Sequence, residues 1–374
     1  MKILDEFMEL VGISSPTGDE RRMADTLKQK LFEIGCEVYE DDAGRALGGT
    51  AGNVIARLKG EGGRPVLLSA HMDRVPNGDG IICRVDGDRI VSAGDTILAA
   101  DDVSGICAIL DGLRRVVKSG RPHGGVEIVF TVHEERLAMG GKFLDYNLIS
   151  ARNAYCFDSP GRIGRIISSA PYKVQFFADV FGKQAHAGNE PERGVNAVVC
   201  ASKCLYDIQD GRIDEETTAN WAVFRAGRME DREQVVTNVV CDHAEICGEA
   251  RSRNKEKLDA YVSFVKEHFR AALESTPAEY TLTVKECFDG FSVPPEDPTV
   301  SILAAELRAM GITPVIEGGG GGMDANRLNA RGIRCVGVAT GYLKNHSTRE
   351  ELFIDDLIRS GELAERLILA YAKA

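Results

Sequence analysis

The stretch AADDVSG, residues 99–105, places two adjacent carboxylates, Asp101 and Asp102, between an apolar run and the start of a predicted helix. Neighbouring carboxylates repel each other. A folded chain tolerates such a pair when a cation lies between the two groups or when one of them stays protonated. The pair therefore predicts partners for these acids elsewhere in the chain.

Further carboxylates and imidazoles follow other apolar runs. They are His71 and Asp73 after residues 64–70, Glu134 and Glu135 after residues 125–132, Asp158 after residues 154–157, and His346 after residues 335–339. Short continuous apolar runs are typical of strands buried on both faces of an α/β sheet, and ligand sites in such sheets collect at the carboxyl ends of the strands. Carboxylates and imidazoles without a thiolate form the ligand set of a two-metal hydrolytic centre.

The local spacing agrees with such a centre. His71 and Asp73 point to the same face of an extended segment, so that one imidazole nitrogen can bind a metal while Asp73 accepts the proton on the other. Adjacent residues at a strand end project differently, so Glu135 can be a ligand while Glu134 acts as a base. Each motif alone has a structural explanation, such as a helix cap or a solvated helix start. Their combination favours the metal centre.

Length and composition limit the class of protein. The chain has 374 residues (40.6 kDa), which predicts two domains. Hydrophobic residues make up 44% and charged residues 27%, and no apolar run is long enough to span a membrane. The formal net charge of -12 argues against nucleic acid and anionic membranes as partners.

The N-terminus and the cysteines indicate a cytoplasmic protein. Acidic residues lie where a signal peptide would need an apolar core. The 10 cysteines are scattered, contain no Cys-x-x-Cys pair, and mostly lie in apolar segments. This usage is typical of buried thiols in a reducing compartment.

The order of predicted elements indicates an α/β domain interrupted by an insertion. We expect an α/β/α domain with a mostly parallel sheet in residues 1–168 and 291–374, and an inserted α+β, ferredoxin-like domain in residues 169–290. The insertion is predicted to contain strands at 173–182, 221–227, 235–248 and 281–287, with helices at 194–208 and 255–273. Residues 294–298, PPEDP, are expected to be the return linker. Residues 75–95, rich in glycine and aspartate, should form turns and short strands.

Several motifs together resemble a known family of metallopeptidases. They are HMD at 71–73, ADD at 100–102, EE at 134–135, Asp158, His346, GKQAHAG at 182–188, GRIDEETTAN at 211–220 and EARS at 249–252. In this order they resemble the superfamily of carboxypeptidase G, aminoacylase, succinyl-diaminopimelate desuccinylase and peptidase T, and most of all the peptidase T-like proteins. The resemblance runs from about residue 5 to the C-terminus.

The resemblance implies a specific centre with two divalent metal ions. One ion would be held by His71 and Asp158, and the other by Glu135 and His346, with Asp101 bridging them. The peptide bond between Asp101 and Asp102 would be cis. Zinc is the expected metal, and cobalt or manganese would accept the same ligands.

The resemblance also implies catalytic roles. Glu134 would be the general base that activates a water bridging the metals and then passes the proton to the leaving amine. Asp73 would orient His71. His186, from the inserted domain of the same chain or of a dimer partner, would hydrogen-bond the oxyanion.

The resemblance places substrate contacts in two further regions. Arg251 would bind the peptide carboxylate, and the backbone of the glycine run at 318–322, with Gly320 and Gly321, would form an anion nest. Asn238 matches an asparagine of the family. After the acid pair, Arg136 departs from the pattern of peptidase T-like relatives, which leaves the substrate preference open.

These observations predict a dinuclear metallo-exopeptidase, an aminopeptidase acting on short peptides such as tripeptides. Two alternatives stay open. The same centre could hydrolyse an N-acyl amino acid or another amide, or the chain could bind peptides without catalysis. The expected partners are a short peptide and a second copy of the chain, joined through the inserted lid or dimerisation domain.

Overall fold

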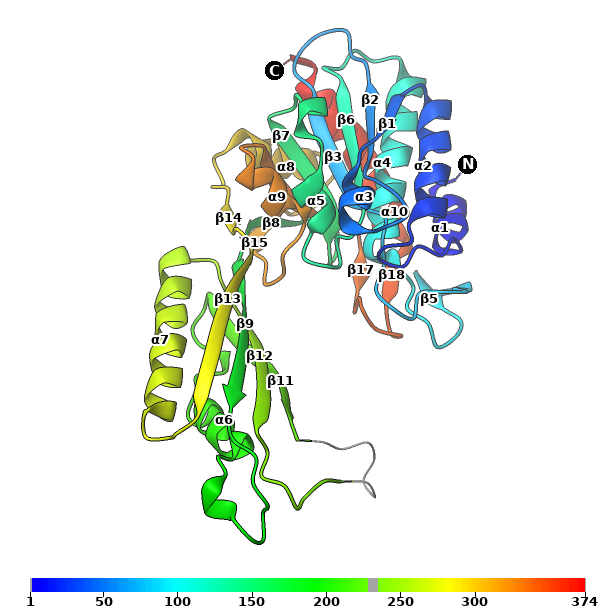
Figure 1. Cartoon of the computed structure of the whole chain (residues 1–374). Helices are drawn as coiled ribbons and strands as arrows, with labels where there is room; N and C mark the ends of the chain where they lie inside the picture. The colour runs from blue at the N-terminus through cyan, green and yellow to red at the C-terminus, as the bar shows by residue number, and fades with distance from the viewer. Residues whose placement is uncertain (1, 228–234, 374) are drawn as a thin grey trace. The chain divides into compact units, whose positions relative to one another are not determined.

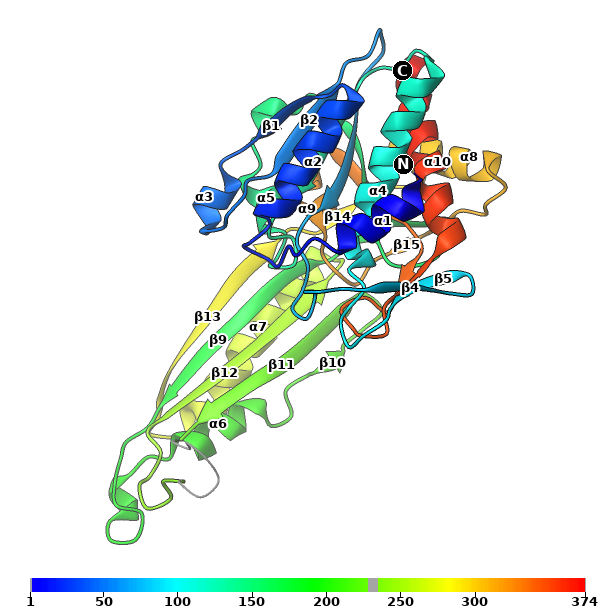
Figure 2. The ribbon, with the colours of Figure 1, turned by 90° about the vertical axis from the view of Figure 1, so that its right-hand side faces the viewer.

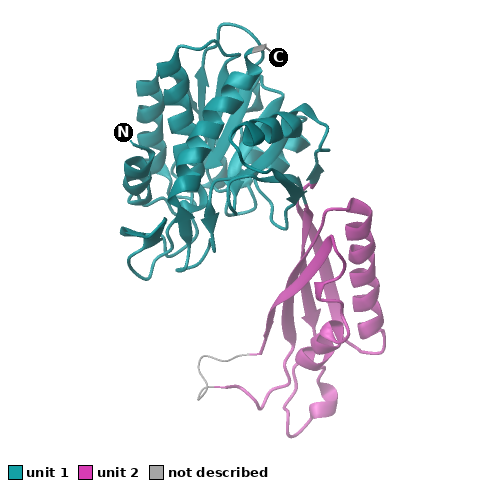
Figure 3. Ribbon diagram, turned by 180° about the vertical axis from the view of Figure 1, so that it is seen from behind, with its two compact units in different colours: residues 1–170, 291–374 teal, residues 171–290 magenta. Residues whose placement is uncertain are grey.

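The computed structural model describes residues 2–227 and 235–373, and it divides into two compact units (Figure 3). The first unit combines residues 1–170 with residues 291–374. The second unit holds residues 171–290 and is therefore an insertion into the first.

A large mixed sheet forms the centre of the first unit (Figure 1). Its strands are β1 Glu37–Glu40, β2 Val54–Leu58, β6 Val126–Thr131, β3 Val66–His71, β7 Asn153–Ser159, β16 Arg334–Ala339, β8 Arg165–Ala170 and β14 Phe291–Ser292, in this spatial order, with β15 Val315–Gly318 beside β8. The central strands β6, β3, β7 and β16 are parallel, and antiparallel pairs lie on both sides of them. This arrangement confirms the predicted α/β class.

Helices cover both faces of this sheet (Figures 1 and 2). One face carries α1 Ile3–Val11, α2 Arg21–Ile34, α4 Ala100–Ser119, α8 Pro298–Ala309 and α10 Ile354–Ala370, and the other carries α3 Ala43–Leu47, α5 Met139–Phe143 and α9 Asp324–Ala330. Helix α4 packs on β3 and β7 because Ile106, Leu110 and Leu113 recur at helical spacing and are fully buried. The helix that begins with the acid pair therefore lies at the centre of the core.

A small antiparallel sheet extends the first unit. Its strands are β17 Tyr342–Leu343, β18 Glu351–Phe353, β5 Arg89–Ser92 and β4 Cys83–Asp86, in this order. Turns and short strands were predicted for residues 75–95, and β4 and β5 confirm them. The loop between β17 and β18 carries His346, so this sheet anchors one of the predicted ligands.

The buried strands predicted in the first unit are confirmed, whereas six of the strands that the structure describes in that unit were missed: β1, β8, β14, β15, β17 and β18. β1 is short and mostly exposed, so it lacks an apolar run. The expected return linker, residues 294–298, was wrong. This segment lies inside the first unit, because β14 has already paired with β8 before the chain reaches it.

The second unit is an antiparallel sheet with two helices packed on it. Its elements are β9 Tyr172–Phe181, α6 Ala197–Leu205, β10 Gly211–Arg212, β11 Thr217–Ala226, β12 His243–Ser252, α7 Lys255–Glu274 and β13 Glu279–Phe288. The sheet order is β10-β11-β12-β9-β13. Alternate residues of β9, such as Val174, Phe176 and Val180, are buried in a core of their own with the apolar faces of α6 and α7. This confirms the predicted inserted α+β domain.

One predicted strand of the second unit was partly wrong. The strand expected at 235–248 begins only at His243. Residues 235–242 form bends and single bridges instead, such as the bridge between Val239 and His186. The valines at 235, 236, 239 and 240 produced the strand signal, although three of them are exposed.

None of the helices in residues 2–227 and 235–373 is both long enough and apolar enough to cross a membrane.

The crossing of α4 and α10 depends on Gly112. A Cβ atom at this position would lie 2.5 Å from the Cβ of Ala364 and 3.0 Å from the backbone nitrogen of Glu365. Gly112→Ala should therefore destabilise the protein by about 1–3 kcal/mol, despite the better helix propensity of alanine. The free energy of unfolding in urea measures the effect. Gly94→Ala is the matched control, since a Cβ there meets nothing within 4 Å, and its free energy of unfolding should stay within about 0.5 kcal/mol of the wild type.

Candidate metal centre

The predicted ligands of the first unit lie together at one edge of the central sheet. His71 ends β3, Asp158 lies near the end of β7, and Glu134 and Glu135 follow β6 after a short turn. Because these strands are parallel and adjacent, their carboxyl ends meet. The start of α4 supplies Asp101 at the same edge.

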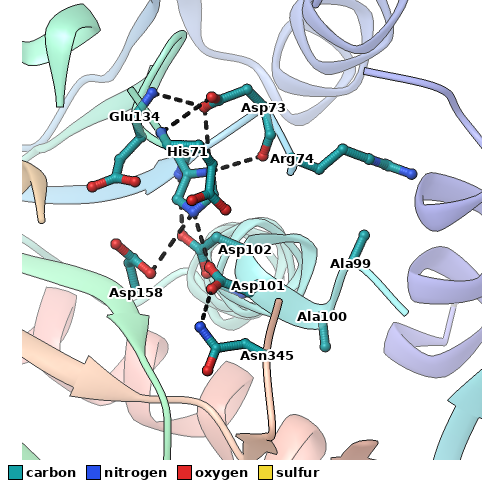
Figure 4. A network of polar contacts seen from close by, with 12 residues as sticks. His71, Asp73, Arg74, Ala99, Ala100, Asp101, Asp102, Glu134, Asp158 and Asn345 are labelled. Carbon is teal, nitrogen blue, oxygen red and sulfur yellow. Dashed lines mark hydrogen bonds and ion pairs between the residues drawn. The ribbon is translucent and has the colours of Figure 1, made fainter. Parts of the chain in front are cut away.

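Asp101 lies between the two predicted imidazole ligands. Its Oδ1 is 3.0 Å from His71 Nε2, and its Oδ2 is 3.2 Å from His346 Nε2 (Figure 4 shows the His71 side). Asn345 donates a hydrogen bond to Oδ2 over 2.6 Å. The peptide bond between Asp101 and Asp102 is cis. Each oxygen of Asp101 therefore faces a different histidine.

A second carboxylate accompanies each histidine. Asp158 Oδ1 lies 3.8 Å from His71 Nε2, and Glu135 Oε1 lies 3.1 Å from His346 Nε2. Ligand atoms of His71, Asp101 and Glu135 lie within 4.8 Å of one another, as do those of His71, Asp102 and Asp158. Both of these groups contain His71 and neither contains His346. The pairwise distances place His71 and Asp158 towards one oxygen of Asp101, and His346 and Glu135 towards the other.

Asp73 contacts both His71 and the turn that carries Glu134. Its carboxylate accepts hydrogen bonds from the backbone N–H of Glu134 at 2.9 Å and of Glu135 at 3.2 Å, and from the Thr17 hydroxyl at 2.8 Å. His71 Nδ1 lies 2.9 Å from the Asp73 carbonyl oxygen and 3.4 Å from its carboxylate. Nδ1 therefore carries a proton, and Nε2, which contacts Asp101 Oδ1 in the metal-free protein, is the nitrogen available to a metal ion. The sequence predicted that Asp73 orients His71, but not that Asp73 also binds the backbone of Glu134 and Glu135.

Burial and mutual repulsion control the charges of this cluster. Burial, together with the charge of neighbouring carboxylates, raises the pKa of Asp158 and of Glu134 well above the ordinary range. Burial also opposes ionisation of Asp101, but hydrogen bonds from His346 and His71 lower its pKa. Hydrogen bonds to Asp101 and Glu135 raise the pKa of His346 to about 10. The cluster concentrates buried negative charge that cations can offset.

The donor set fits divalent metal ions. Carboxylates and imidazoles suit Zn, Co and Mn, and the atoms already converge on shared positions. A bridging carboxylate between two groups of donors is the usual ligand arrangement of a two-metal hydrolytic site.

Several supporting side chains were missed by sequence reasoning. Tyr342 donates a hydrogen bond to Asp158 Oδ1 over 3.1 Å, and Glu350 accepts one from the backbone of Asp101. Thr131 donates a short hydrogen bond to Asp324, a buried acid. Asp324 lies two residues after the glycine run, and Glu350 follows His346 by four residues. The only sequence feature that could have indicated Asp324 and Glu350 was therefore their closeness in the chain to a predicted site residue.

The turn that carries Glu134 has an unusual backbone. His133, Leu137 and Ala138 have φ values of 51°, 70° and 49°. Non-glycine residues in the left-handed region are strained, and such residues gather at functional sites. Arg327 donates hydrogen bonds to the carbonyl oxygens of Leu137 and Ala138 at 2.8 Å and 3.1 Å, which holds the turn.

The remaining predicted site residues lie in other places. His186, Asn238 and Arg251 belong to the second unit and are described within it. His186 is exposed, and its Nδ1 accepts hydrogen bonds from the backbone N–H of residues 188 and 189. Arg251 lies on β12 and donates to Glu249 over 2.8 Å. Gly320 and Gly321 lie in the first unit, in the exposed loop between β15 and α9.

Comparisons with known proteins support a peptidase. The peptidase dimerisation domain of the M20 peptidases matches residues 172–277, and the model of peptidase family M28 matches residues 53–166. The uncharacterized protein YqjE of Bacillus subtilis (strain 168) is 37% identical to this chain. The match covers 100% of this chain and 99% of YqjE.

Two solved structures match over the whole chain. Aminopeptidase PepT from Bacillus cereus ATCC 10987 is 37% identical and superposes with a TM-score of 0.90, covering 100% of this chain and 98% of its own. A tripeptidase from Staphylococcus aureus subsp. aureus mu50 is 31% identical with a TM-score of 0.94 and the same coverage. The chain therefore belongs to the M20 metallopeptidase family, among its peptidase T-like members.

Proposed function

We propose that this protein is a dinuclear metal-dependent aminopeptidase that hydrolyses short peptides, with tripeptides as its main substrates. The observation that carries the proposal is the position of Asp101, whose two carboxylate oxygens face two separate groups of donors. The similarity to an aminopeptidase and a tripeptidase over the whole chain supports the substrate class.

In this proposal, His71 and Asp158 would hold one divalent ion, Glu135 and His346 would hold the other, and Asp101 would serve both. When bound, the ions would supply Lewis acidity and lower the pKa of the attacking water. Zinc is the metal that we expect, with cobalt and manganese as alternatives.

Glu134 is the proposed general base. The contacts described for this residue hold its backbone to Asp73, which leaves the carboxylate to accept a proton from the attacking water and to pass it to the leaving amine. Asp73 would keep the proton of His71 on Nδ1, so that Nε2 gives up its own proton when a metal ion binds there.

His186 is suited to stabilise the oxyanion. Because its Nδ1 accepts two backbone hydrogen bonds at 3.1 Å, the proton of the neutral ring lies on Nε2. That N–H can donate to the oxygen on which negative charge develops. The match to a peptidase dimerisation domain supports a homodimer formed through the second unit, so this histidine could serve its own chain or the partner.

Arg251 is the proposed contact for the peptide carboxylate, together with Asn238 and the backbone of Gly320 and Gly321. Arg251→Ala should raise KM for a tripeptide by about tenfold to a hundredfold, because a charge-assisted hydrogen bond contributes about 1.5–3 kcal/mol. A tripeptide amide is the control, since it lacks the carboxylate. Equal KM increases for both substrates would contradict this role.

A substrate panel tests the proposed function. Purified protein loaded with Zn, Co or Mn is given tripeptides, N-acetylated tripeptides and N-acetyl amino acids, and the products are separated by chromatography. We expect release of the N-terminal residue from unblocked tripeptides. Cleavage confined to acylated substrates would instead identify an amidohydrolase, and binding without cleavage would identify a peptide carrier.

The thiols support a cellular location. The cysteines, all within the described residues, are present as free thiols. Free thiols in this number are typical of proteins in a reducing compartment, and the proposed location is therefore the cytoplasm.

A further inference from the structure

The carboxylate of Glu350 is buried beneath the candidate metal centre. Glu350 is only 2% exposed. One oxygen accepts hydrogen bonds from the backbone N–H of Leu98 at 2.8 Å and Ala99 at 2.9 Å, and the other accepts one from the backbone N–H of Asp101 at 3.0 Å. Both oxygens of this carboxylate are thus committed to the few residues that lead into Asp101.

Those residues have a backbone that needs such support. Ala99 has a φ of 57°, in the left-handed region that alanine rarely adopts. A left-handed alanine persists only where surrounding contacts fix it. Asp101 has φ -81° and ψ 100°, so the first turn of α4 is irregular and its helical hydrogen bonds do not fix this residue. A carboxylate accepts hydrogen bonds on both oxygens, and it binds backbone N–H groups most strongly when ionised. Burial, together with the charge of Asp101, raises the pKa of Glu350 to about 7.

Glu350 also belongs to the segment that carries His346. The backbone N–H of Glu350 donates to the carbonyl oxygen of Ser347, so a short turn separates the two side chains. A second link exists on the same segment, where Asn345 donates to Asp101 Oδ2 over 2.6 Å. One side chain therefore joins the segment of one candidate ligand to the backbone of another.

We propose that Glu350 is a positioning residue that fixes the backbone of Asp101 relative to His346, so that the Asp101 carboxylate can serve both metal ions. The inference rests on the proposed dinuclear centre. In this role Glu350 acts only through the backbone that carries Asp101.

Glutamine at position 350 removes one of the two acceptor oxygens that bind the backbone of residues 98–101. Its amide group has one oxygen that accepts hydrogen bonds and one NH₂ group that only donates. Glu350→Gln would place that NH₂ group against backbone N–H groups of the segment 98–101, so part of the support is lost and a repulsive contact is added.

Metal titration of E350Q tests the inference without relying on activity. Metal-free wild type and E350Q are titrated with Zn²⁺ in competition with a chromophoric chelator. We expect two ions per wild-type chain and, for E350Q, an affinity for at least one ion that is about 10–100-fold weaker, as is usual when support of a metal ligand is removed.

Glu127→Gln is the matched control. Glu127 is also a buried carboxylate of the first unit, and it accepts hydrogen bonds from the backbone N–H of Ser150 and Ala151 and from the Ser150 hydroxyl. It lies near the start of β6, whereas the turn with Glu134 follows the end of that strand. Both variants should lose stability to urea, but E127Q should bind two ions with the affinity of the wild type.

A second substitution tests the mechanism. If Glu350 acts by holding Ala99 in the left-handed region, glycine at position 99 should need less support. The double variant E350Q/A99G should therefore recover part of the lost metal affinity.

The possible outcomes separate the two proposals. Wild type that binds no metal would overturn the proposed function itself. Wild type with two ions and E350Q with unchanged affinity would overturn only the role of Glu350. Equal losses of affinity in E350Q and E127Q, or an E350Q chain that does not fold while E127Q does, would show that Glu350 serves general stability and would also overturn the inference.

Discussion

Replacing Glu134 with glutamine should lower kcat for tripeptide hydrolysis by about a thousandfold or more, which corresponds to about 4 kcal/mol of transition-state stabilisation. Glutamine has nearly the same shape as glutamate but cannot accept a proton from water. The contacts that hold this residue come from its backbone N–H to Asp73, so the substitution should leave the turn in place. Steady-state kinetics on a tripeptide measure the effect.

Two controls separate loss of the base from loss of structure. E134Q should bind metal with the stoichiometry of the wild type, and its free energy of unfolding should not fall. Glu134 lies among other buried acids, and burial raises its pKa, so the neutral side chain should even relieve repulsion. An E134Q protein with wild-type kcat would mean that another group is the base, and equal inactivity of both proteins would favour a peptide-binding protein without catalysis.

The part of the fold that could be predicted is the part with strong hydrophobic patterning. The buried runs that became β3, β6 and β7 are too short for typical helices and suit the strands of a parallel sheet. Exposed β1 has no such pattern. The valines at 235–240 have the pattern of a strand, but the described residues beside them form single bridges and no ladder.

The candidate ligands could be predicted because most of them end or follow a recognisable strand or begin a helix. The supporting residues could not, because their role exists only after folding. Thr17 bonds Asp73 across 56 residues, and Glu350 bonds Asp101 across 249. Glu350 lies four residues after His346, but neither Glu350 nor Thr17 belongs to a local pattern that indicates its role. Their roles depend on which segments the sheet brings together.

Removal of the metal ions should abolish hydrolysis and change the dependence of stability on pH. Dialysis against a chelator should reduce activity to background, and Zn²⁺, Co²⁺ or Mn²⁺ should restore it. A bound ion should raise the free energy of unfolding by about 2.7 kcal/mol at a free concentration of about 100 Kd. Thermal unfolding with and without metal measures this increase. Unchanged activity after complete removal, verified by elemental analysis, would contradict the metal-dependent mechanism.

The sign of the pH effect follows from the groups that must lose protons. Hydrogen bonds to Asp101 and Glu135 raise the pKa of His346 to about 10, so without metal this imidazole is protonated at pH 7. Because its pKa is raised in the folded state, the stability it contributes is full below its unfolded pKa of about 6.5 and is lost as pH rises towards about 10.

Metal binding instead requires the neutral ring and releases its proton, so metal affinity should rise with pH over the same interval. The metal-free protein should therefore lose stability between about pH 6.5 and 10 while the stabilisation by metal grows. Calorimetric titrations in buffers of different ionisation enthalpy would count the released protons. Zinc binding without proton release at pH 7 would show that His346 is not a ligand.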